Sequence, residues 1–297
     1  MIRIILTILF CVLSSIASAS DVRGIFFQPR ESDLTIPAEN WPTIFSLAKT
    51  KGFNTLVIQW TAFGDTFSSP QNQAWLKDRM LEASKAELKL IVGLGGDPEI
   101  FTRLKQPPSI VGSYFRKMNE ANLLLAQYWV KVLPKDVISG WYLPLEIDDR
   151  QWRELPARVE LTKYLKRQVM DLNVVTPLPV YISSFFTGNM TPERYAVMLE
   201  SIESQSKVYF WIQNGGGTNK LMALERDLYI SAITNCSGYA ASGIIYELFK
   251  QTQVDSNFAA KPLSPAEMNK ALQQKSPCQG DNLFFALNYV IDFTDPK

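Results

Sequence analysis

The stretch VISGWYLPLE, residues 137–146, is apolar along most of its length and ends on a carboxylate, Glu146. Similar short, largely apolar runs recur along the chain, separated by longer segments, and they cover residues 24–28, 55–60, 88–93, 179–184, 208–213, 243–247 and 283–287. Nearly continuous apolar runs of this length are typical of strands in a parallel sheet whose faces are covered by helices. The chain therefore predicts eight buried β-strands.

The segments between these runs carry helix signals. Apolar residues from Trp41 to Ala48 recur at helical spacing, and Gly52 is placed to end that helix. Thr191 and Ser264 are each followed by proline, a pattern that predicts a helix N-terminus. Eight strands alternating with helices, without a linker, predict an α/β fold made of a single (β/α)8 barrel, or TIM barrel. A doubly wound open sheet is the alternative.

The N-terminus has the form of a secretory signal peptide. Arg3 supplies a positive charge, residues 4–13 are apolar, and Ala17-Ser18-Ala19 offers small residues for cleavage. Ten apolar residues are too few to span a bilayer as a helix, although an uncleaved short anchor is the alternative. We expect a signal peptide over residues 1–19, a barrel domain over 20–297, and export to the periplasm rather than the medium. No stable membrane insertion is expected after cleavage.

Charge and cysteine content narrow the class of protein further. Thirty basic residues against 29 acidic ones give a net charge of +1, which provides no basis for binding nucleic acid. Cys236 and Cys278 lie beyond the signal peptide, just before adjacent predicted strands, and an oxidising compartment would favour a disulfide between them. Two free buried thiols are the alternative. The sequence assigns no oligomeric state.

The chain contains no histidine. This excludes Ser-His-Asp and Cys-His catalysis and the usual zinc sites, and it leaves acid–base chemistry to carboxylates, tyrosines or lysines. We expect neither a cofactor nor a metal. A divalent cation held by Asp148 and Asp149 is a weaker alternative.

Two glutamates end apolar strands that otherwise need no charge. Glu146 and Glu247 would both lie at the C-terminal ends of strands, where (β/α)8 enzymes build their active sites. Two facing carboxyl groups suit glycoside hydrolysis, so we predict this pair to be catalytic. The alternative is that each forms a structural ion pair, for example with Arg30 or Arg150.

Polar and aromatic residues gather at or near the same strand ends. Aromatic rings can stack on sugars, although core packing is the alternative for any one of them. The loop at residues 215–217 is expected to be a flexible lip of the cleft. We predict that the substrate is bound by Gln28, Arg30, Gln59, Trp60, Tyr142, Asp148, Tyr181, Trp211, Gln213 and Tyr246.

Residues 24–29, 41–60 and 140–148 resemble an uncharacterised bacterial family of exported barrels, a domain of unknown function regarded as glycoside-hydrolase-like. The resemblance covers nearly the whole mature chain and implies the same barrel fold. The carboxylate positions are also similar to those of clan A retaining glycosidases, which implies that Glu146 is the acid/base and Glu247 the nucleophile. Those enzymes usually carry asparagine before the acid/base, where this chain has Leu145.

These observations favour an exported glycoside-hydrolase-like protein that acts on a polysaccharide or oligosaccharide by a two-carboxylate mechanism. A non-catalytic carbohydrate-binding barrel that assists polysaccharide export or assembly is the first alternative. A barrel used only as a scaffold for protein interactions is the second.

Overall fold

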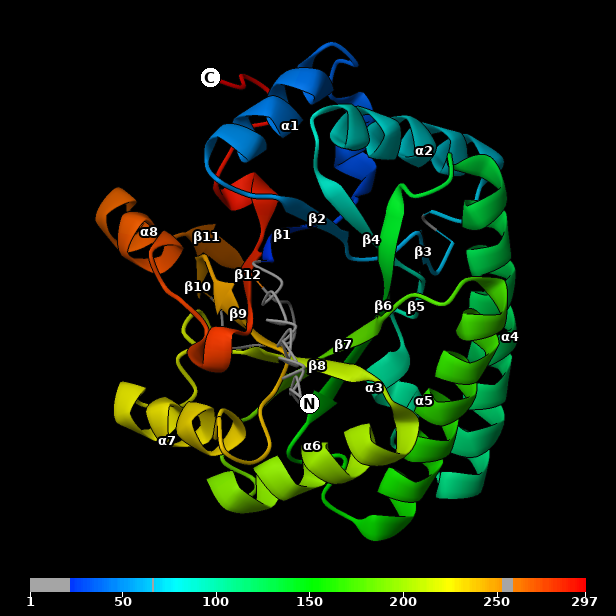
Figure 1. Cartoon of the computed structure of the whole chain (residues 1–297), viewed down its shortest axis with the longest axis vertical. Helices are drawn as coiled ribbons and strands as arrows, with labels where there is room; N and C mark the ends of the chain where they lie inside the picture. The colour runs from blue at the N-terminus through cyan, green and yellow to red at the C-terminus, as the bar shows by residue number, and fades with distance from the viewer. Residues whose placement is uncertain (1–21, 66, 253–258) are drawn as a thin grey trace, which may run out of the picture.

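A computed structural model describes residues 22–65, 67–252 and 259–297, so the predicted signal peptide lies outside the described residues. Its centre is a closed barrel in which all neighbouring strands are parallel, as Figure 1 shows in a view along the barrel. This confirms the predicted (β/α)8 fold. In order around the barrel, the strands are β1 (Arg23–Phe27), β12 (Asp281–Phe285), β9 (Gly243–Glu247), β8 (Tyr209–Gln213), β7 (Val180–Phe185), β6 (Ile138–Asp148), β4 (Lys89–Gly93) and β2 (Thr55–Ile58).

Helices surround this barrel (Figure 1). They are α1 (Asn40–Thr50), α2 (Pro70–Lys85), α3 (Ile100–Arg103), α4 (Pro108–Val132), α5 (Leu155–Val175), α6 (Pro192–Ser206), α7 (Ala223–Ile233) and α8 (Pro265–Leu272), with 3-10 turns η1 (Glu31–Thr35), η2 (Pro277–Gln279) and η3 (Leu287–Tyr289). Two small sheets lie outside the barrel, one of β3 (Ala62–Phe63) with β5 (Gly95–Gly96), the other of β10 (Phe249–Gln251) with β11 (Ala260–Pro262).

Side chains along each strand alternate between two apolar cores, as the pleat of a strand requires. In β1, Phe26 belongs to the small cluster inside the barrel, whereas its neighbours Ile25 and Phe27 join the large cluster between strands and helices. The interior cluster consists of Phe26, Val57, Ile91, Tyr142, Trp211, Ile245, Leu283 and Ala286. A polar residue two positions beyond one of these therefore faces the barrel axis.

The predicted helix signals act as expected. Gly52 follows α1 with φ +86°, a left-handed conformation that glycine adopts without strain. The Thr191 hydroxyl accepts a hydrogen bond from the Arg194 backbone N–H, and Ser264 forms a capping box with Glu267. These local signals define where α6 and α8 begin.

Strand β6 contains an irregularity next to its carboxylate. Leu143 pairs with Ile182 of β7, but the next pair is Glu146 with Ser183, so Pro144 and Leu145 have no partner residues on that strand. Proline has no N–H to give to a sheet, and bulges are among the few places where a strand tolerates it. The bulge brings Glu146 level with Ser183.

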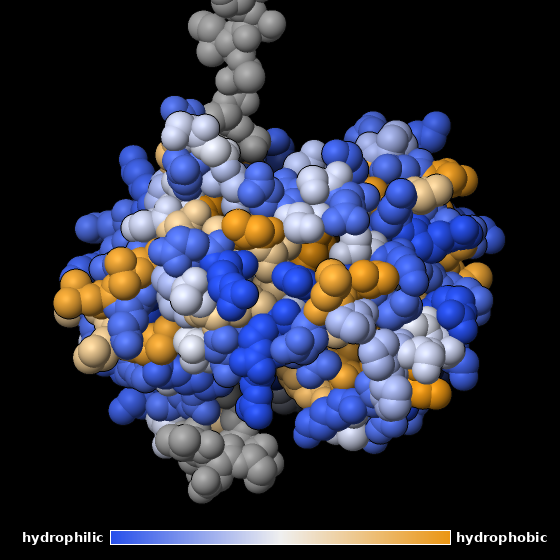
Figure 2. Space-filling model, turned by 90° about the horizontal axis from the view of Figure 1, so that it is seen from below, coloured by the Kyte–Doolittle hydropathy of each residue, from blue (hydrophilic) through white to orange (hydrophobic). Residues whose placement is uncertain are grey.

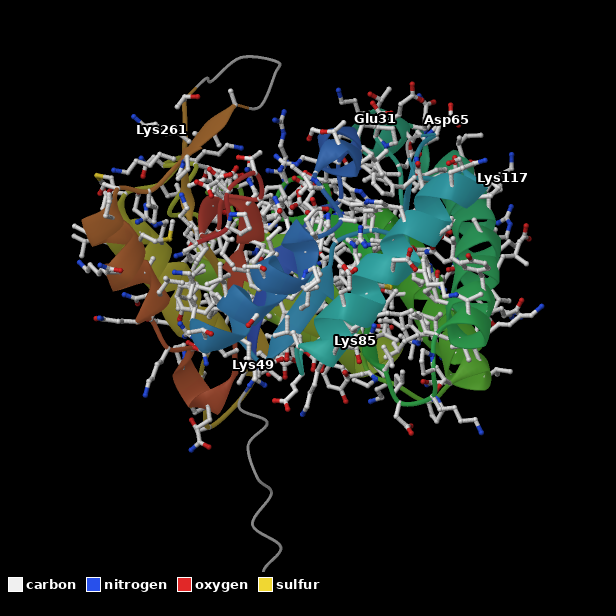
Figure 3. All side chains as sticks on the ribbon, turned by 90° about the horizontal axis from the view of Figure 1, so that it is seen from above. Glu31, Lys49, Asp65, Lys85, Lys117 and Lys261 are labelled. Atoms are coloured by element: carbon white, nitrogen blue, oxygen red, sulfur yellow. A yellow bond between two sulfur atoms is a disulfide. The ribbon has the colours of Figure 1, made fainter. Side chains whose placement is uncertain are left out.

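The barrel has two distinct ends. Figure 3 shows Glu31, which follows β1, and Lys261 of β11 at one end, with Lys49 and Lys85 toward the other. Because the strands are parallel, all eight finish at the end that carries Glu31, and we call this end the mouth. Figure 2 shows the side of the molecule that carries α6 and α7, where apolar residues are scattered among hydrophilic ones.

A disulfide lies at the end opposite the mouth. Cys236 follows α7 and Cys278 lies in η2, and their Cα atoms are 5.3 Å apart. This confirms the predicted bridge, which connects the segments that lead into the neighbouring strands β9 and β12. None of the helices in the described residues combines the length and the apolar character that crossing a membrane requires.

Candidate active site

The two predicted catalytic glutamates both lie at the mouth. Glu247 is the last residue of β9, two positions beyond the interior residue Ile245, and its exposed fraction is 6%. Glu146 lies near the end of β6 and is partly exposed. It pairs with Ser183 of β7. The Ser183 hydroxyl accepts a hydrogen bond from the interior residue Tyr142 over 2.9 Å, so this level of the sheet faces the barrel interior. Both side chains therefore face the barrel axis.

The loop after β8 supports the Glu247 carboxylate. The backbone N–H of Gly217 donates to Oε2 of Glu247 over 2.6 Å, and the Gly217 carbonyl accepts from the backbone N–H of Gln251 over 2.8 Å. A Cβ atom at position 217 would stand 2.7 Å from the carbonyl oxygen of Phe249, which leaves no room for a side chain. Residues 215–217 were expected to be a flexible lip, but Gly217 is anchored between two strand ends.

Glu146 receives a hydrogen bond from the neighbouring side of the barrel. The Gln213 amide on β8 donates to Oε1 of Glu146 over 2.7 Å. Among the residues that the structure describes, no basic group lies within ion-pair distance of Glu146 or Glu247. Arg30, the suggested partner, is exposed and pairs with Asp33 over 3.3 Å. The described geometry thus contains no ion pair of the alternative kind.

The environment opposes ionisation of both carboxyl groups. The pKa of Glu247 is raised to about 7. Burial is the largest cause, and the negative charge of Glu146 acts in the same direction, whereas the hydrogen bond from Gly217 lowers the pKa. The pKa of Glu146 is also raised, first by burial, against the lowering effect of the Gln213 hydrogen bond. The charge of Glu146 therefore affects the titration of Glu247, and at pH 7 a substantial part of Glu247 is uncharged.

Three of the predicted sugar-stacking aromatics form one stack inside the barrel. The rings of Tyr181 and Trp211 are stacked with their centroids 4.2 Å apart, and Tyr142 stacks on Trp211 at 6.0 Å. The Trp211 indole is fully buried and donates its N–H to Asp281 over 2.9 Å. Because these rings cover one another's faces, they fill the interior rather than offer an open surface to a sugar.

The other two aromatics also make packing contacts. Trp60 is 9% exposed, stacks on Phe63 with centroids 4.3 Å apart, and donates its N–H to the carbonyl of Pro29. Tyr246 belongs to the core between strands and helices and contacts Phe284. Since Glu247 faces the axis, the adjacent Tyr246 must face outward, and the structure does not bring it to the mouth.

The remaining predicted residues divide into two groups. Gln28 lies two positions beyond the interior residue Phe26, and Gln59 two positions beyond Val57, so both face the axis near the mouth. The Oε1 atom of Gln59 is buried without a hydrogen-bond partner among the described residues. Asp148 instead accepts hydrogen bonds from the backbone N–H groups of Arg150 and Gln151. Its burial is the main cause that raises its pKa.

Asp149 is committed to protein contacts rather than to a cation. It is fully buried and accepts hydrogen bonds from Thr187, Asn189 and Met190. In the described parts of the chain, no cluster of three or more histidine, cysteine, aspartate or glutamate side chains is arranged to hold a metal ion.

Comparison with known proteins identifies the family. A family model described as "Domain of unknown function (DUF4434)" matches residues 22–295. The chain belongs to the DUF4434 family. This confirms the resemblance to an uncharacterised family of glycoside-hydrolase-like barrels. The DUF4434 chain is also 39% identical over 270 residues to the uncharacterized protein YbcH of Escherichia coli (strain K12), an alignment that covers 91% of this chain and 90% of that protein.

Solved structures share the fold of the DUF4434 chain. A candidate α-L-fucosidase from Bacteroides thetaiotaomicron VPI-5482 is similar with a TM-score of 0.67 and 14% identity, covering 90% of this chain and 85% of that one. A GH18 chitinase from Pseudoalteromonas aurantia is similar with a TM-score of 0.50 and 13% identity, covering 92% and 96% respectively. At these identities the likeness shows the fold alone, a (β/α)8 barrel.

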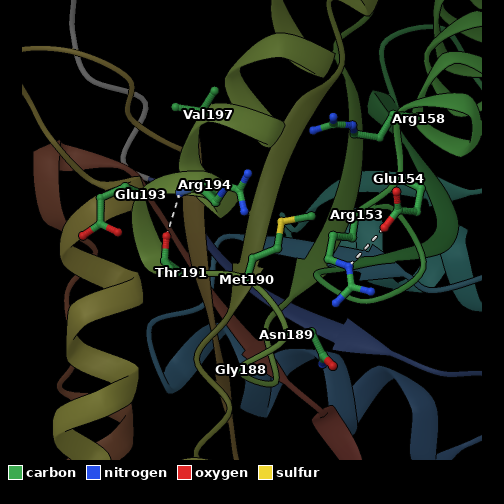
Figure 4. Close-up of a pocket in the computed structure, with 10 residues that line it drawn as sticks. All are labelled: Arg153, Glu154, Arg158, Gly188, Asn189, Met190, Thr191, Glu193, Arg194 and Val197. Carbon is green, nitrogen blue, oxygen red and sulfur yellow. Dashed lines mark hydrogen bonds and ion pairs between the residues drawn. The ribbon is translucent and has the colours of Figure 1, made fainter.

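One feature of the DUF4434 chain escaped the sequence reasoning. A cavity of about 820 Å³ lies between the loop after β6 and the loop after β7, with Arg153, Arg158 and Arg194 in its lining (Figure 4). The prediction from sequence considered only residues at strand ends, whereas these arginines lie around the first turns of α5 and α6. The clustering of basic residues near two successive helix starts was the available signal.

Proposed function

We propose that this protein is an exported glycoside hydrolase that cleaves a polysaccharide or oligosaccharide with Glu146 and Glu247 as its catalytic pair. The observation that carries the proposal is the placement of two carboxyl groups that face the axis at the mouth of a barrel, with no ion pair to either from the described residues. The glycoside-hydrolase-like fold supports it.

The proposed mechanism divides the work between the two carboxyl groups. The resemblance to clan A enzymes gives Glu146 the acid role: in its acid form it donates a proton to the glycosidic oxygen, which leaves as a hydroxyl group when its bond to the anomeric carbon breaks. Glu247 attacks that carbon in its ionised form, which only part of the free protein carries at pH 7 because the pKa of Glu247 is raised to about 7. Glu146 then takes a proton from the water that hydrolyses the glycosyl–enzyme intermediate. The Gly217 N–H holds Glu247 in place and the Gln213 amide holds Glu146, so the pair is preorganised before a substrate arrives.

The substitution Glu146→Gln tests this assignment. Glutamine keeps the shape of the side chain but cannot transfer a proton, so we expect the release of reducing ends from a panel of neutral and acidic polysaccharides to fall by a factor of at least about 100. Circular dichroism should match that of the wild type, and the unfolding midpoint should not fall, since glutamine carries no charge to bury.

The matched control is Glu120→Gln on the exposed surface of α4, which should keep full activity. A Glu146→Gln variant that hydrolyses its substrate as fast as the wild type would reject the catalytic role of Glu146.

One observation favours a second candidate function, a carbohydrate-binding barrel without catalysis. Leu145 stands where clan A enzymes usually carry asparagine, and its side chain is buried in the core between strands and helices. That position therefore offers no group to hold a sugar hydroxyl. The binding function would appear as saturable sugar binding by the wild type with no release of reducing ends.

Export and the carbohydrate substrate belong to the same proposal. The Cys236–Cys278 disulfide supports an oxidising compartment, since such bridges persist outside the cytoplasm. The glycosidase-like fold supports a glycan as the molecule that is bound. We propose the periplasm as the compartment, with the signal peptide over residues 1–19 as the export signal.

A further inference from the structure

The cavity beside the mouth is large enough to hold a sugar unit. Its volume of about 820 Å³ lies within the usual range of roughly 300–1,000 Å³ for small-molecule pockets. Its walls are the loop after β6, the loop after β7, and the first turns of α5 and α6 (Figure 4). It is separate from the two catalytic glutamates, neither of which lines it.

The charged side chains of the cavity lining carry a small net positive charge. Arg153, Arg158 and Arg194 line it, against two acidic residues, Glu154 and Glu193. Arg153 pairs with Glu154 over 3.3 Å. Figure 4 shows the guanidinium groups of Arg158 and Arg194 extending toward the space between α5 and α6.

Arg158 and Arg194 carry positive charges that the described protein does not neutralise. Within residues 22–65, 67–252 and 259–297, no carboxylate lies within ion-pair distance of either guanidinium group. Arginine presents its N–H donors in a planar fork that matches a carboxylate, and such bidentate pairs are among the stronger polar contacts. The two arginines are therefore free to receive an anionic group.

A buried carboxylate fixes one wall of the cavity. Asp149 accepts hydrogen bonds from the backbone N–H groups of Thr187, Asn189 and Met190 over 3.0, 2.7 and 3.2 Å. The Tyr229 hydroxyl donates to the carbonyl of Met190. The loop after β7 is thus held from both sides, and a preformed wall reduces the entropy that a ligand must overcome.

The lining also contains apolar side chains. Met190 and Val197 line the cavity together with the arginines. An acidic sugar presents both kinds of surface, an apolar C–H face and a carboxylate, whereas a bare inorganic anion presents only charge. The combination fits a sugar acid better than phosphate or sulfate.

We propose that this cavity is a subsite for the carboxylate of a uronic acid unit, so that the substrate class is an acidic polysaccharide. This inference rests on the proposed function, because it places the subsite beside the hydrolytic centre. Asp149, which fixes the cavity wall, lies three residues beyond Glu146 and directly follows the last residue of the same strand, β6. In this proposal the glycan leaves the mouth between β6 and β7 and reaches Arg158 and Arg194 in the cavity lining.

The test measures binding to the full-length mature protein that carries Glu146→Gln, so that hydrolysis does not consume the ligand. The probes are hexamers of galacturonic acid and of mannuronic acid, each compared with its fully methyl-esterified form and with inorganic phosphate. We expect at least one acidic hexamer to bind about tenfold or more tightly than its ester, and salt to weaken this preference.

The double substitution Arg158→Gln and Arg194→Gln should abolish the preference for the acid form. The matched control is Arg116→Gln with Lys117→Gln on exposed α4, which removes the same charge elsewhere and should retain the preference. Equal binding of acid and ester by both hexamers, an unchanged preference in the double variant, or phosphate binding as tightly as the hexamers would overturn the proposal.

The outcomes separate this subsite from the hydrolase itself. Acid-selective binding without any hydrolysis by the wild type leaves the subsite standing and rejects the enzyme. Hydrolysis that depends on Glu146, without acid-selective binding, rejects the subsite and keeps the enzyme.

Discussion

Glu247 lies in a place that disfavours its own charge. Its side chain is almost fully buried, and one backbone N–H from Gly217 together with the Thr218 backbone offsets only part of the cost of removing the carboxylate from water. A group that served stability alone would gain from a nearby cation within ion-pair distance, yet none of the described residues provides one. Destabilising charges of this kind are common at functional sites, where activity is gained at a cost in stability.

The raised pKa of Glu247 predicts how stability changes with pH. Between the ordinary value of 4.5 and about 7, the folded protein binds a proton that the unfolded chain releases, so stability falls as pH rises through this window. The loss amounts to about 3 kcal/mol by the linkage relation. The substitution Glu247→Gln should therefore raise the free energy of unfolding at pH 8 by up to that amount and leave it unchanged at pH 4.

Urea unfolding at the two pH values measures this effect, with the exposed Glu120→Gln as the control. A Glu247→Gln variant that shows the same difference from wild type at pH 4 and pH 8 would contradict the burial of an ionisable carboxyl at this position.

At the scale of elements, the loop between β8 and α7 positions a carboxylate that belongs to a different strand. Gly217 reaches Glu247 of β9 and is itself held by Gln251 of β10. The bulge in β6 has a comparable effect on Glu146, since it brings that residue level with Ser183. An irregularity in β6 therefore sets the position of Glu146, and a loop from the neighbouring strand supports the carboxylate of Glu247.

The substitution Gly217→Ala tests the role of this loop. The added Cβ would lie 2.7 Å from the Phe249 carbonyl oxygen, so the loop must move and Glu247 loses the backbone N–H that lowers its pKa. We expect the pKa of Glu247, followed by carbon NMR of its carboxyl group, to rise above that of the wild type.

The neighbouring Gly216→Ala is the matched control, because its Cβ would meet only Asn214 side-chain atoms at 3.4 Å or beyond. It should leave the titration of Glu247 unchanged. The same titration in the Gly217→Ala variant and the wild type would show that the loop does not support the carboxylate.

At the scale of the whole molecule, the disulfide ties together the segments that precede β9 and β12, opposite the mouth. The two cysteines are 42 residues apart in the sequence, and closing a loop of this length restricts the unfolded chain by about 4 kcal/mol in the chain-entropy model. Replacing both with serine should lower the free energy of unfolding by about 2–4 kcal/mol.

Urea unfolding of this double variant, compared with wild type under reducing and oxidising conditions, checks the prediction. Reduced wild type should match the variant in stability. If reduction leaves the wild-type midpoint unchanged, the bridge does not contribute to the stability of the barrel.

The fold could be read almost completely from the chain, because its signals are local. Short apolar runs define the eight strands of the barrel, and caps such as Thr191 define where helices begin. The end of the barrel at which Glu146 and Glu247 lie also followed from sequence, since every parallel strand ends on the same side. The disulfide was expected from the position of each cysteine before adjacent strands, with two free thiols as the alternative, and the structure confirms the bridge.

Only the tertiary structure decided what each strand-end side chain contacts. A shift of one residue moves a side chain from the axis to the helix layer, and this difference separates Glu247 at the mouth from Tyr246 in the outer core. The support of Glu247 by Gly217, and the placement of Arg158 and Arg194 around one cavity, join segments that are distant in sequence. Such contacts depend on how helices and loops pack around the closed sheet, whereas strand and helix formation depends on near neighbours in the chain.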